Sequence, residues 1–386
     1  MPSGRRTQAR PFPPLKAAAK TAVSTPLKEP SPLSSSTGSD ADLTQALAET
    51  VRGAAADRRP LEIRGAGTRA GMGRAVSGTP LEMTAHRGVV DYDPAELVLT
   101  ARAGTPVSEI EALLAENGQM LAFEPPRLGP GGTLGGAVAT GLSGPRRPFT
   151  GALRDFVLGA RILDGRGEVL RFGGTVFKNV AGFDAFRLMA GAHGTLGVLL
   201  DISLRVVPRP AVEAARVLET PSAEALAQVA ALMRRPLPLS GAFHDGRRLH
   251  LRLSGGRAGV DAAVARIGGE AADPAAWDAI RDLTHPALAG PGGLWRIALP
   301  RTGPAGDFAS LPWDQGGGVR WLAAEAPPPE AWDQAASLGG HIERIRGAAG
   351  PAFQPLSPAL LALHQRVKAA LDPDGLLNPG RMYAEI

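Results

Sequence analysis

From residue 41 onwards, hydrophobic and polar positions follow each other with the periods of helices and strands, and glycine and proline mark the breaks. This region is predicted to begin with a helix over 42–56, two short strands over 60–64 and 81–84, and a hairpin over 89–104. A further strand over 119–123 and a second hairpin over 155–174 follow. Another helix precedes the strand at 119, with Thr105 as its N-cap, Pro106 at its first position and Gly118 at its end. A long strand over 198–207 completes this mixed α and β region.

Two prolines after the long strand, Pro208 and Pro210, mark the expected domain boundary. Beyond them, strands alternate with helices predicted over 222–235 and 259–269, and a last helix with a polar turn follows residue 356. The predicted fold class is therefore α+β. We expect a disordered basic tail over 1–40 and a first domain over 41–210. A smaller α+β domain over 211–355 and a C-terminal segment over 356–386 are expected to follow.

The composition excludes several classes of protein. The chain has no cysteine, so it forms no disulfide and by itself holds no thiolate-ligated zinc or iron–sulfur centre. No apolar run reaches the roughly 18–20 residues that span a membrane. Residues 1–40 hold six basic and two acidic side chains, so this tail carries +4 of the net charge of +5. A nearly neutral body with 5% aromatic residues argues against nucleic acid as a partner.

Arginine dominates the basic residues, and the pair Arg-Arg occurs five times along the chain. We interpret these pairs, Arg146 and Arg147 among them, as compositional bias on solvated surfaces. The pair Arg5 and Arg6 lacks the apolar stretch that follows it in an export signal. A cytoplasmic protein is therefore expected.

Glycine-rich stretches follow two of the predicted strands. The first, GAGTRA at 65–70, fits the G-x-G-x-x-A fingerprint of a dinucleotide-binding fold. Three glycines and a proline in 71–80 argue against the helix that must follow, since each glycine costs about 1 kcal/mol there and the proline about 3 kcal/mol. A loop whose N–H groups form an anion-binding nest is the alternative. The second stretch, 129–144, has seven glycines, and both loops could converge on one pyrophosphate.

A succession of motifs carries a specific resemblance to a known family. The most informative are RGAGT at 64–68, GGTLGGAVATG at 131–141, VFKNVAGFDAFRLMAGAHGTLG at 176–197 and DPDGLLNPGRMY at 372–383. In this order they resemble the FAD-binding domain of the vanillyl-alcohol oxidase / p-cresol methylhydroxylase (PCMH-type) flavoproteins, and within it the FAD-binding subunits of bacterial glycolate oxidases. The resemblance implies a PCMH-type domain of two α/β subdomains that hold FAD between them, with a separate α+β cap over the flavin.

The same resemblance implies which residues bind FAD. The first loop contributes Arg64, Gly65, Ala66, Gly67 and Thr68, and the second loop with its continuation contributes Gly131, Gly132, Thr133, Gly135, Gly136, Gly141 and Ser143. The adenosine loop contributes Gly197 and Val198, and a C-terminal segment that returns to the flavin region contributes Asn378 and Arg381. A bulky side chain at Gly132 or Gly135 is expected to fill the space of the pyrophosphate.

Two further features bear on the flavin. Some members attach FAD through a histidine in the first loop, where this chain has Thr68 and Arg69, so non-covalent FAD is expected. Lys178 is the only lysine between residues 29 and 367. A role as a positive point charge near the flavin would explain why lysine and not arginine occurs at this position, and so would chance.

Catalytic residues are harder to assign. Oxidation of a 2-hydroxy acid by a flavin needs a base for the hydroxyl proton and a cation for the carboxylate. The catalytic subunits of resembling dehydrogenases carry H-x-G-D-G-N and G-E-H-G signatures, and neither occurs here. His244 and His250 would need a third ligand to hold a metal, so we interpret them as surface or loop residues, and His193 as a structural hydrogen-bonding residue. No catalytic residue and no metal ligand is assigned.

The leading hypothesis is an FAD-dependent oxidoreductase subunit of a glycolate oxidase-type complex, which takes part in the oxidation of glycolate to glyoxylate. The missing signatures imply a second FAD-binding catalytic subunit, and the lack of cysteine implies that any iron–sulfur centre lies on another subunit. Such partners would hold the chain at the inner face of a membrane. The alternatives are a stand-alone FAD-dependent 2-hydroxy acid or alcohol oxidoreductase, and a non-catalytic structural subunit.

Overall fold

A computed structural model describes residues 41–174, 185–290, 292–347 and 350–386. The predicted basic tail, 1–40, and Lys178 lie outside these residues. Among the described residues, no helix combines the length and the apolar character that crossing a membrane requires.

The N-terminal elements form a small α/β unit. Helix α2 (Thr44–Ala56) packs its apolar face on strand β1 (Leu61–Arg64), which pairs in parallel with β2 (Thr79–Glu82). Turns connect β1 to β2, and no helix forms over 65–78. The prediction that GAGTRA does not open a dinucleotide-binding helix is confirmed.

A five-stranded antiparallel sheet follows, with strand order β3-β4-β8-β6-β7. Its strands in chain order are β3 (Val89–Asp93), β4 (Val98–Arg102), β6 (Val157–Leu163), β7 (Val169–Gly173) and β8 (Val198–Arg205). The central strand β8 is buried along almost its whole length, as its continuous run of apolar residues predicts. The helices and short strands around the sheet are α3 (Val107–Glu116), β5 (Gln119–Met120), α4 (Leu134–Thr140), α5 (Arg147–Thr150), α6 (Leu153–Phe156), η1 (Ala185–Met189) and β9 (Val207–Pro208).

Two predicted boundaries were wrong. Thr105 does not cap α3, because its hydroxyl accepts a hydrogen bond from the N–H of Gly88 and donates one to the carbonyl of Gly88. Pro106 takes the N-cap position instead, with no side-chain cap. The strand expected over 119–123 ends at Met120, and the apolar residues after it enter the core as a turn.

The second sheet has eight strands in the order β13-β10-β12-β11-β15-β16-β14-β17, all antiparallel. These strands are β10 (Val212–Glu219), β11 (Leu239–His244), β12 (Arg248–Gly255), β13 (Glu270–Ala272), β14 (Leu294–Ala298), β15 (Trp313–Asp314), β16 (Val319–Ala323) and β17 (His341–Arg346). The helices of this region are α7 (Ser222–Met233), α8 (Arg257–Ile267), α9 (Ala276–Arg281), η2 (Pro286–Leu288), η3 (Gly306–Ser310), η4 (Gln315–Gly317) and α10 (Pro329–Ser337). The α+β class predicted for this half is confirmed.

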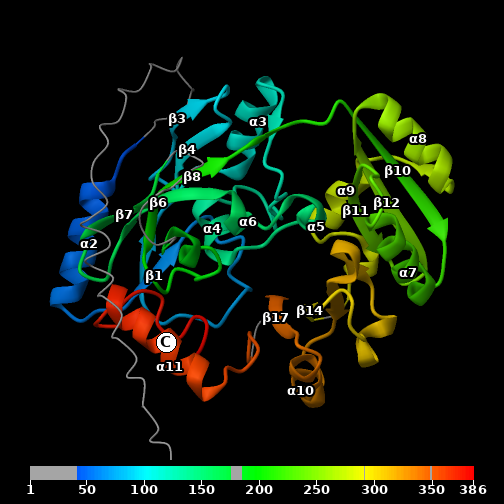
Figure 1. The fold of residues 1–386 in the computed structure, drawn as a ribbon. Coiled ribbons are helices and arrows are strands. Elements are labelled where there is room, and N and C mark those ends of the chain that lie inside the picture. The colour runs from blue at the N-terminus through cyan, green and yellow to red at the C-terminus, as the bar shows by residue number, and fades with distance from the viewer. Residues whose placement is uncertain (1–40, 175–184, 291, 348–349) are drawn as a thin grey trace, which may run out of the picture.

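Alternate residues of the large sheet serve two different cores. Ala242 of β11 packs with α7 and α8, whereas the neighbouring Phe243 packs with Trp277 of α9. The core around Phe243 also includes Met72 and Leu142, which come from the first half of the chain. Figure 1 shows the two sheets side by side, with α7 and α8 on the outer side of the larger one.

A buried ion network also joins the two halves. The Glu124 carboxylate accepts from Arg146 Nε at 3.1 Å and from Arg252 Nη2 at 2.7 Å, and the three side chains are less than 10% exposed. Arg146 Nη2 reaches Glu213 at 2.7 Å. The interpretation of Arg146 as a solvated residue was therefore wrong, although its neighbour Arg147 is exposed.

Beside this network, Asp314 is fully buried, and burial raises its pKa to about 7 from its ordinary value of 3.8. The nearby charge of Glu124 raises this pKa too, while the Gln315 N–H, Arg252 and Arg296 lower it only in part. Because the folded protein binds this proton more tightly than the unfolded chain, the free energy of unfolding should fall as pH rises from about 4 to about 7. An Asp314→Asn variant keeps the oxygen that accepts from Gln315.

We expect Asp314→Asn to gain stability relative to the wild type as pH rises, because asparagine carries no charge to bury. Urea titrations of both proteins at about pH 5 and about pH 8 measure this difference. A difference in unfolding free energy that stays the same at the two pH values would contradict the assignment.

The C-terminal segment returns to the first half of the chain, as Figure 1 shows in red. It consists of α11 (Pro358–Leu371) and a turn that pairs with β1 through Leu61 N–H to the Leu376 carbonyl at 2.8 Å. The buried Lys368 ammonium donates to Asp372 and to the carbonyls of Thr195 and Leu377. These contacts fix the terminal residues beside the first glycine loop.

Candidate functional site

A cavity of about 340 Å³ lies where β1, both glycine-rich loops, the residues before β8 and the C-terminal turn meet. Its volume falls in the range of small-molecule sites. Eleven of the residues predicted to bind FAD line it: Arg64, Gly65, Ala66, Gly67, Thr68, Thr133, Gly135, Gly136, Gly197, Asn378 and Arg381.

The two glycine loops touch each other at one end of the cavity. A side-chain carbon built on Gly65 would lie 2.6 Å from Thr133 Oγ1, so glycine is required there for the loops to meet. A carbon built on Gly131 would lie 3.7 Å from the Ala66 side chain. The Thr133 hydroxyl accepts a hydrogen bond from the N–H of Gly136 at 3.2 Å and so caps α4. The two loops therefore meet, and their binding of one pyrophosphate stays a prediction.

Five predicted residues do not line the cavity. Gly131 and Gly132 lie next to it, against Ala66 and Thr68 of the first loop. Gly141 ends α4 with a φ of 65°, and Ser143 accepts the N–H of Leu153. Val198 begins β8 and is fully buried in the apolar core.

Gly135 is needed for packing against Ala103, and not to leave space for the pyrophosphate as predicted. A carbon built on this glycine would lie 2.8 Å from the side chain and 3.0 Å from the carbonyl oxygen of Ala103. Glycine at this position lets α4 lie against β4, so a bulky residue would disturb packing before it reached a ligand. Ala66, which is exposed in the cavity and already has a side chain, is a cleaner position for a steric test.

Positive charge in the cavity exceeds negative charge among the described residues that line it. Arg64 pairs with Glu62 at 2.6 Å. Arg381 donates to the carbonyls of Arg74, at 2.9 Å, and of Arg69, at 3.0 Å, and pairs with no carboxylate of the described residues. Arg69 is 8% exposed, and within the described part of the chain it likewise hydrogen-bonds no carboxylate. This excess of positive charge, with Arg69 buried and without a carboxylate partner among the described residues, fits an anionic ligand such as a diphosphate.

Sequence reasoning missed Arg69. Nothing in the sequence distinguishes it from the many other arginines of this chain except its place directly after RGAGT. The structure shows that its guanidinium turns back toward the second loop, where a carbon built on Gly132 would lie 3.1 Å from Arg69 Nη1.

Asn378 joins the C-terminal turn to the rest of the site. Its Oδ1 accepts the N–H of Ile63 at 2.7 Å, and its Nδ2 donates to the carbonyl of His193 at 2.7 Å. Its backbone has a φ of 44°, which asparagine tolerates better than most residues. Asn378 therefore holds β1 and the loop before β8 in a fixed relation around the cavity.

His193 lines the cavity in an unusual conformation. Its φ is 51°, and burial lowers its pKa to about 4, so its imidazole is neutral at physiological pH. The predicted structural role is carried by its backbone, which donates to Ala139 and accepts from Asn378. Its ring packs edge-on against Phe353, with 5.0 Å between the ring centroids.

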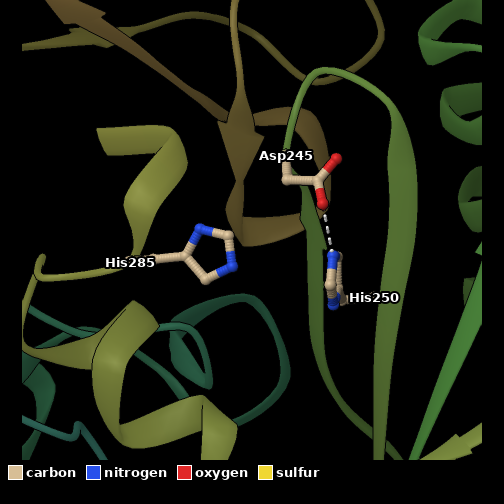
Figure 2. A group of neighbouring side chains, drawn as sticks. All are labelled: Asp245, His250 and His285. Atoms are coloured by element: carbon tan, nitrogen blue, oxygen red, sulfur yellow. Dashed lines mark hydrogen bonds and ion pairs between the residues drawn. The ribbon is translucent and has the colours of Figure 1, made fainter. Parts of the chain in front are cut away.

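Three other histidines, His244, His250 and His285, lie outside the cavity in the half of the chain that holds the larger sheet. His244, expected at the surface, is fully buried, and its two ring nitrogens contact the Thr220 carbonyl and the Gly246 N–H. His250 bonds Asp245 at 2.9 Å, and Figure 2 shows His285 facing this pair.

Three potential ligand atoms of Asp245, His250 and His285 lie within 4.8 Å of one another, which the sequence did not predict because His285 is distant in the chain. His285 Nδ1, however, accepts the N–H of Ala287 at 3.2 Å. In a neutral ring its other nitrogen must then carry the proton, which leaves no lone pair there for a metal. The group is better described as a hydrogen bond between Asp245 and His250, with the His285 ring packed edge-on against that of His250.

Comparison with known proteins identifies the family. Residues 41–173 match the FAD binding domain, and residues 354–382 match the C-terminal domain of FAD linked oxidases. The chain is 47% identical to the glycolate oxidase subunit GlcE of Escherichia coli, over 90% of this chain and 99% of that protein.

More distant relatives match a smaller part of the chain. The D-2-hydroxyglutarate dehydrogenase of Xanthomonas citri is 30% identical over 44% of this chain and 36% of that enzyme, and the glycolate oxidase subunit GlcD of Bacillus subtilis is 30% identical over 40% and 33%. A solved structure of alkyldihydroxyacetonephosphate synthase, 16% identical, superimposes with a TM-score of 0.60 over 86% of this chain and 74% of that one, which shows a shared fold. The chain therefore belongs to the family of the glycolate oxidase subunit GlcE and carries the FAD-binding domain of the FAD-linked oxidases.

Proposed function

We propose that this chain is the FAD-binding subunit of a glycolate oxidase-type enzyme that oxidises glycolate to glyoxylate. The observation that carries the proposal is the near full-length match to GlcE together with the cavity between the two glycine loops. FAD bound there would supply the redox chemistry of the subunit, because a flavin can take up electrons and pass them on. The first loop, the start of α4 and Arg381 would hold its diphosphate end without a covalent bond, since no histidine lies in the first loop.

The acid–base inventory of the cavity favours a subunit that depends on partners. General bases work best with a pKa near the operating pH. Among the described residues that line the cavity, the histidine is His193, with a pKa of about 4, and the carboxylate is Glu62, which is paired with Arg64. Neither is suited to take the hydroxyl proton of the substrate. We therefore place the main substrate-oxidising site on a second flavin-binding subunit, and the iron–sulfur centre on another subunit.

In this proposal the complex works in the cytoplasm, at the inner face of the membrane through its partner subunits. Electrons leave this chain for the iron–sulfur subunit, because a chain without cysteine supplies no thiolate ligands for such a centre.

The visible spectrum of the chain expressed alone tests the proposal. We expect stoichiometric flavin absorbance that is released as intact FAD on denaturation, and little or no bleaching when glycolate is added without partner subunits. Bleaching should appear when the partner subunits are co-expressed and co-purified. A colourless chain that takes up no added FAD would disprove the flavoprotein assignment, and rapid bleaching by glycolate alone would favour the stand-alone oxidoreductase.

A further inference from the structure

We infer that Arg69 is the buried cation that compensates the negative charge of the cofactor's diphosphate, and that this charge is the main reason for its burial. The inference rests on the proposed function and adds a residue that the family resemblance did not supply. It concerns a side chain that lines the cavity and lies where the two glycine loops meet.

Arg69 is enclosed but incompletely partnered. Its Nη2 donates to the carbonyl of Pro126 at 2.7 Å, and its Nη1 donates to Thr68 Oγ1 at 3.1 Å. Its Nε is buried and has no hydrogen-bond partner among the residues that the structure describes. Burial alone lowers its pKa, to about 10, with no carboxylate acting in the opposite direction, so the guanidinium stays charged at physiological pH.

A charged guanidinium that is buried without an anion raises the free energy of the folded protein, because burial removes its hydration and no anion compensates its charge. The buried Arg146 and Arg252 meet the carboxylate of Glu124, whereas the equally buried Arg320 has carbonyl partners and lines no part of the cavity. Around Arg69 the space for an anion is the cavity itself, which Arg69 lines together with Gly65, Ala66 and Thr133. A diphosphate there would supply the missing counter-charge, and arginine binds phosphate oxygens well because of its planar set of donors.

The position of the guanidinium fits this role. Carbons built on Gly132 and Gly136 would lie 3.1 Å and 3.7 Å from Arg69 Nη1, so the cation lies against the backbone of the second loop. Its bond to Pro126 also fixes the residues that lead into that loop. One side chain thus places positive charge beside both segments predicted to surround the diphosphate.

The rival explanation is that Arg69 serves only as a clamp between Thr68 and Pro126. The two explanations differ in what they predict for ligands with and without phosphate. A charge partner affects FAD and ADP but not riboflavin, which has the flavin ring and no phosphate. A clamp affects the shape of the whole site and weakens all three ligands alike.

Arg320 provides a matched control. It is 3% exposed, burial lowers its pKa to about 10, and it donates to the carbonyl oxygens of Gly317 and Val319. It belongs to β16 of the larger sheet and does not line the cavity. Arg320→Gln therefore removes an equally buried cation from a place where no diphosphate is proposed.

The test uses flavin-depleted full-length protein and measures dissociation constants for FAD, ADP and riboflavin by titration calorimetry. Arg69→Gln should weaken FAD and ADP binding by roughly 10- to 100-fold and leave riboflavin binding unchanged. Arg69→Lys, which keeps a positive charge, should recover most of the FAD affinity, and Arg320→Gln should leave all three constants unchanged. The melting temperature of ligand-free Arg69→Gln should not fall, because the variant loses an uncompensated buried charge.

The possible results distinguish the inference about Arg69 from the clamp explanation and from the proposed function. Equal loss of FAD and riboflavin binding, with a lower melting temperature of the ligand-free variant, would show a clamp and overturn the inference. Unchanged FAD affinity in Arg69→Gln would also overturn it, while leaving the proposed function intact. Wild-type protein that binds no FAD would overturn the proposed function, and the inference with it.

Discussion

Replacing Glu124 with alanine is expected to lower the free energy of unfolding by about 3–5 kcal/mol. The Glu124 carboxylate is the shared acceptor for Arg146 and Arg252, which are 6% and 5% exposed. Without it, Arg252 retains bonds to Ser240 but no ion pair with another described residue, and Arg146 retains the outer carboxylate of Glu213. The variant leaves two cations buried between the halves of the chain.

Urea denaturation of the full chain measures this loss. Glu111→Ala is the control, because Glu111 forms an ion pair with Arg127 whose side chain is 46% exposed, and such pairs contribute about 0–1 kcal/mol. Glu124→Gln, which keeps the shape and one acceptor oxygen, should lie between the two. A loss of less than about 1 kcal/mol in Glu124→Ala would show that the network contributes little to stability.

The glycine loops were predictable because the requirement for glycine is local. The sequence RGAGT follows a strand, and the glycines at 71, 73 and 78 exclude a helix after it, so a bare loop was the remaining possibility. The need for small residues in 131–136 is equally visible in the sequence. Contact between Gly65 and Thr133 then follows from packing that a PCMH-type fold implies and the structure confirms.

The charges of the site were not predictable in the same way. The environment of an arginine depends on residues far away in the sequence, such as Pro126 for Arg69 and Glu213 for Arg146. Arg146 is therefore buried, although the many arginine pairs of this chain favour a solvated residue there. Asp245 and His250 are close in the sequence, but His285 lies near them only because η2 packs there. The spacing of residues in the sequence does not reveal this packing.

The largest effect on cofactor binding is expected from Ala66→Trp. Ala66 is exposed in the cavity, and its side chain faces Gly131 of the second loop. An indole at this position would occupy the space between the loops that the diphosphate is proposed to fill. We expect FAD affinity to fall by at least about 100-fold, which corresponds to about 2.7 kcal/mol, so that the purified protein is colourless.

Measurements on the ligand-free variant show whether the loss of FAD comes from exclusion of the ligand or from misfolding. Ala66 lies outside the apolar cores, so the melting temperature of the ligand-free variant should stay close to that of the ligand-free wild type. Ala95→Trp, at an exposed turn away from the cavity, is the matched control and should keep its flavin. Stoichiometric FAD in folded Ala66→Trp would mean that the diphosphate lies elsewhere, because the two glycine loops are too close together to hold both groups.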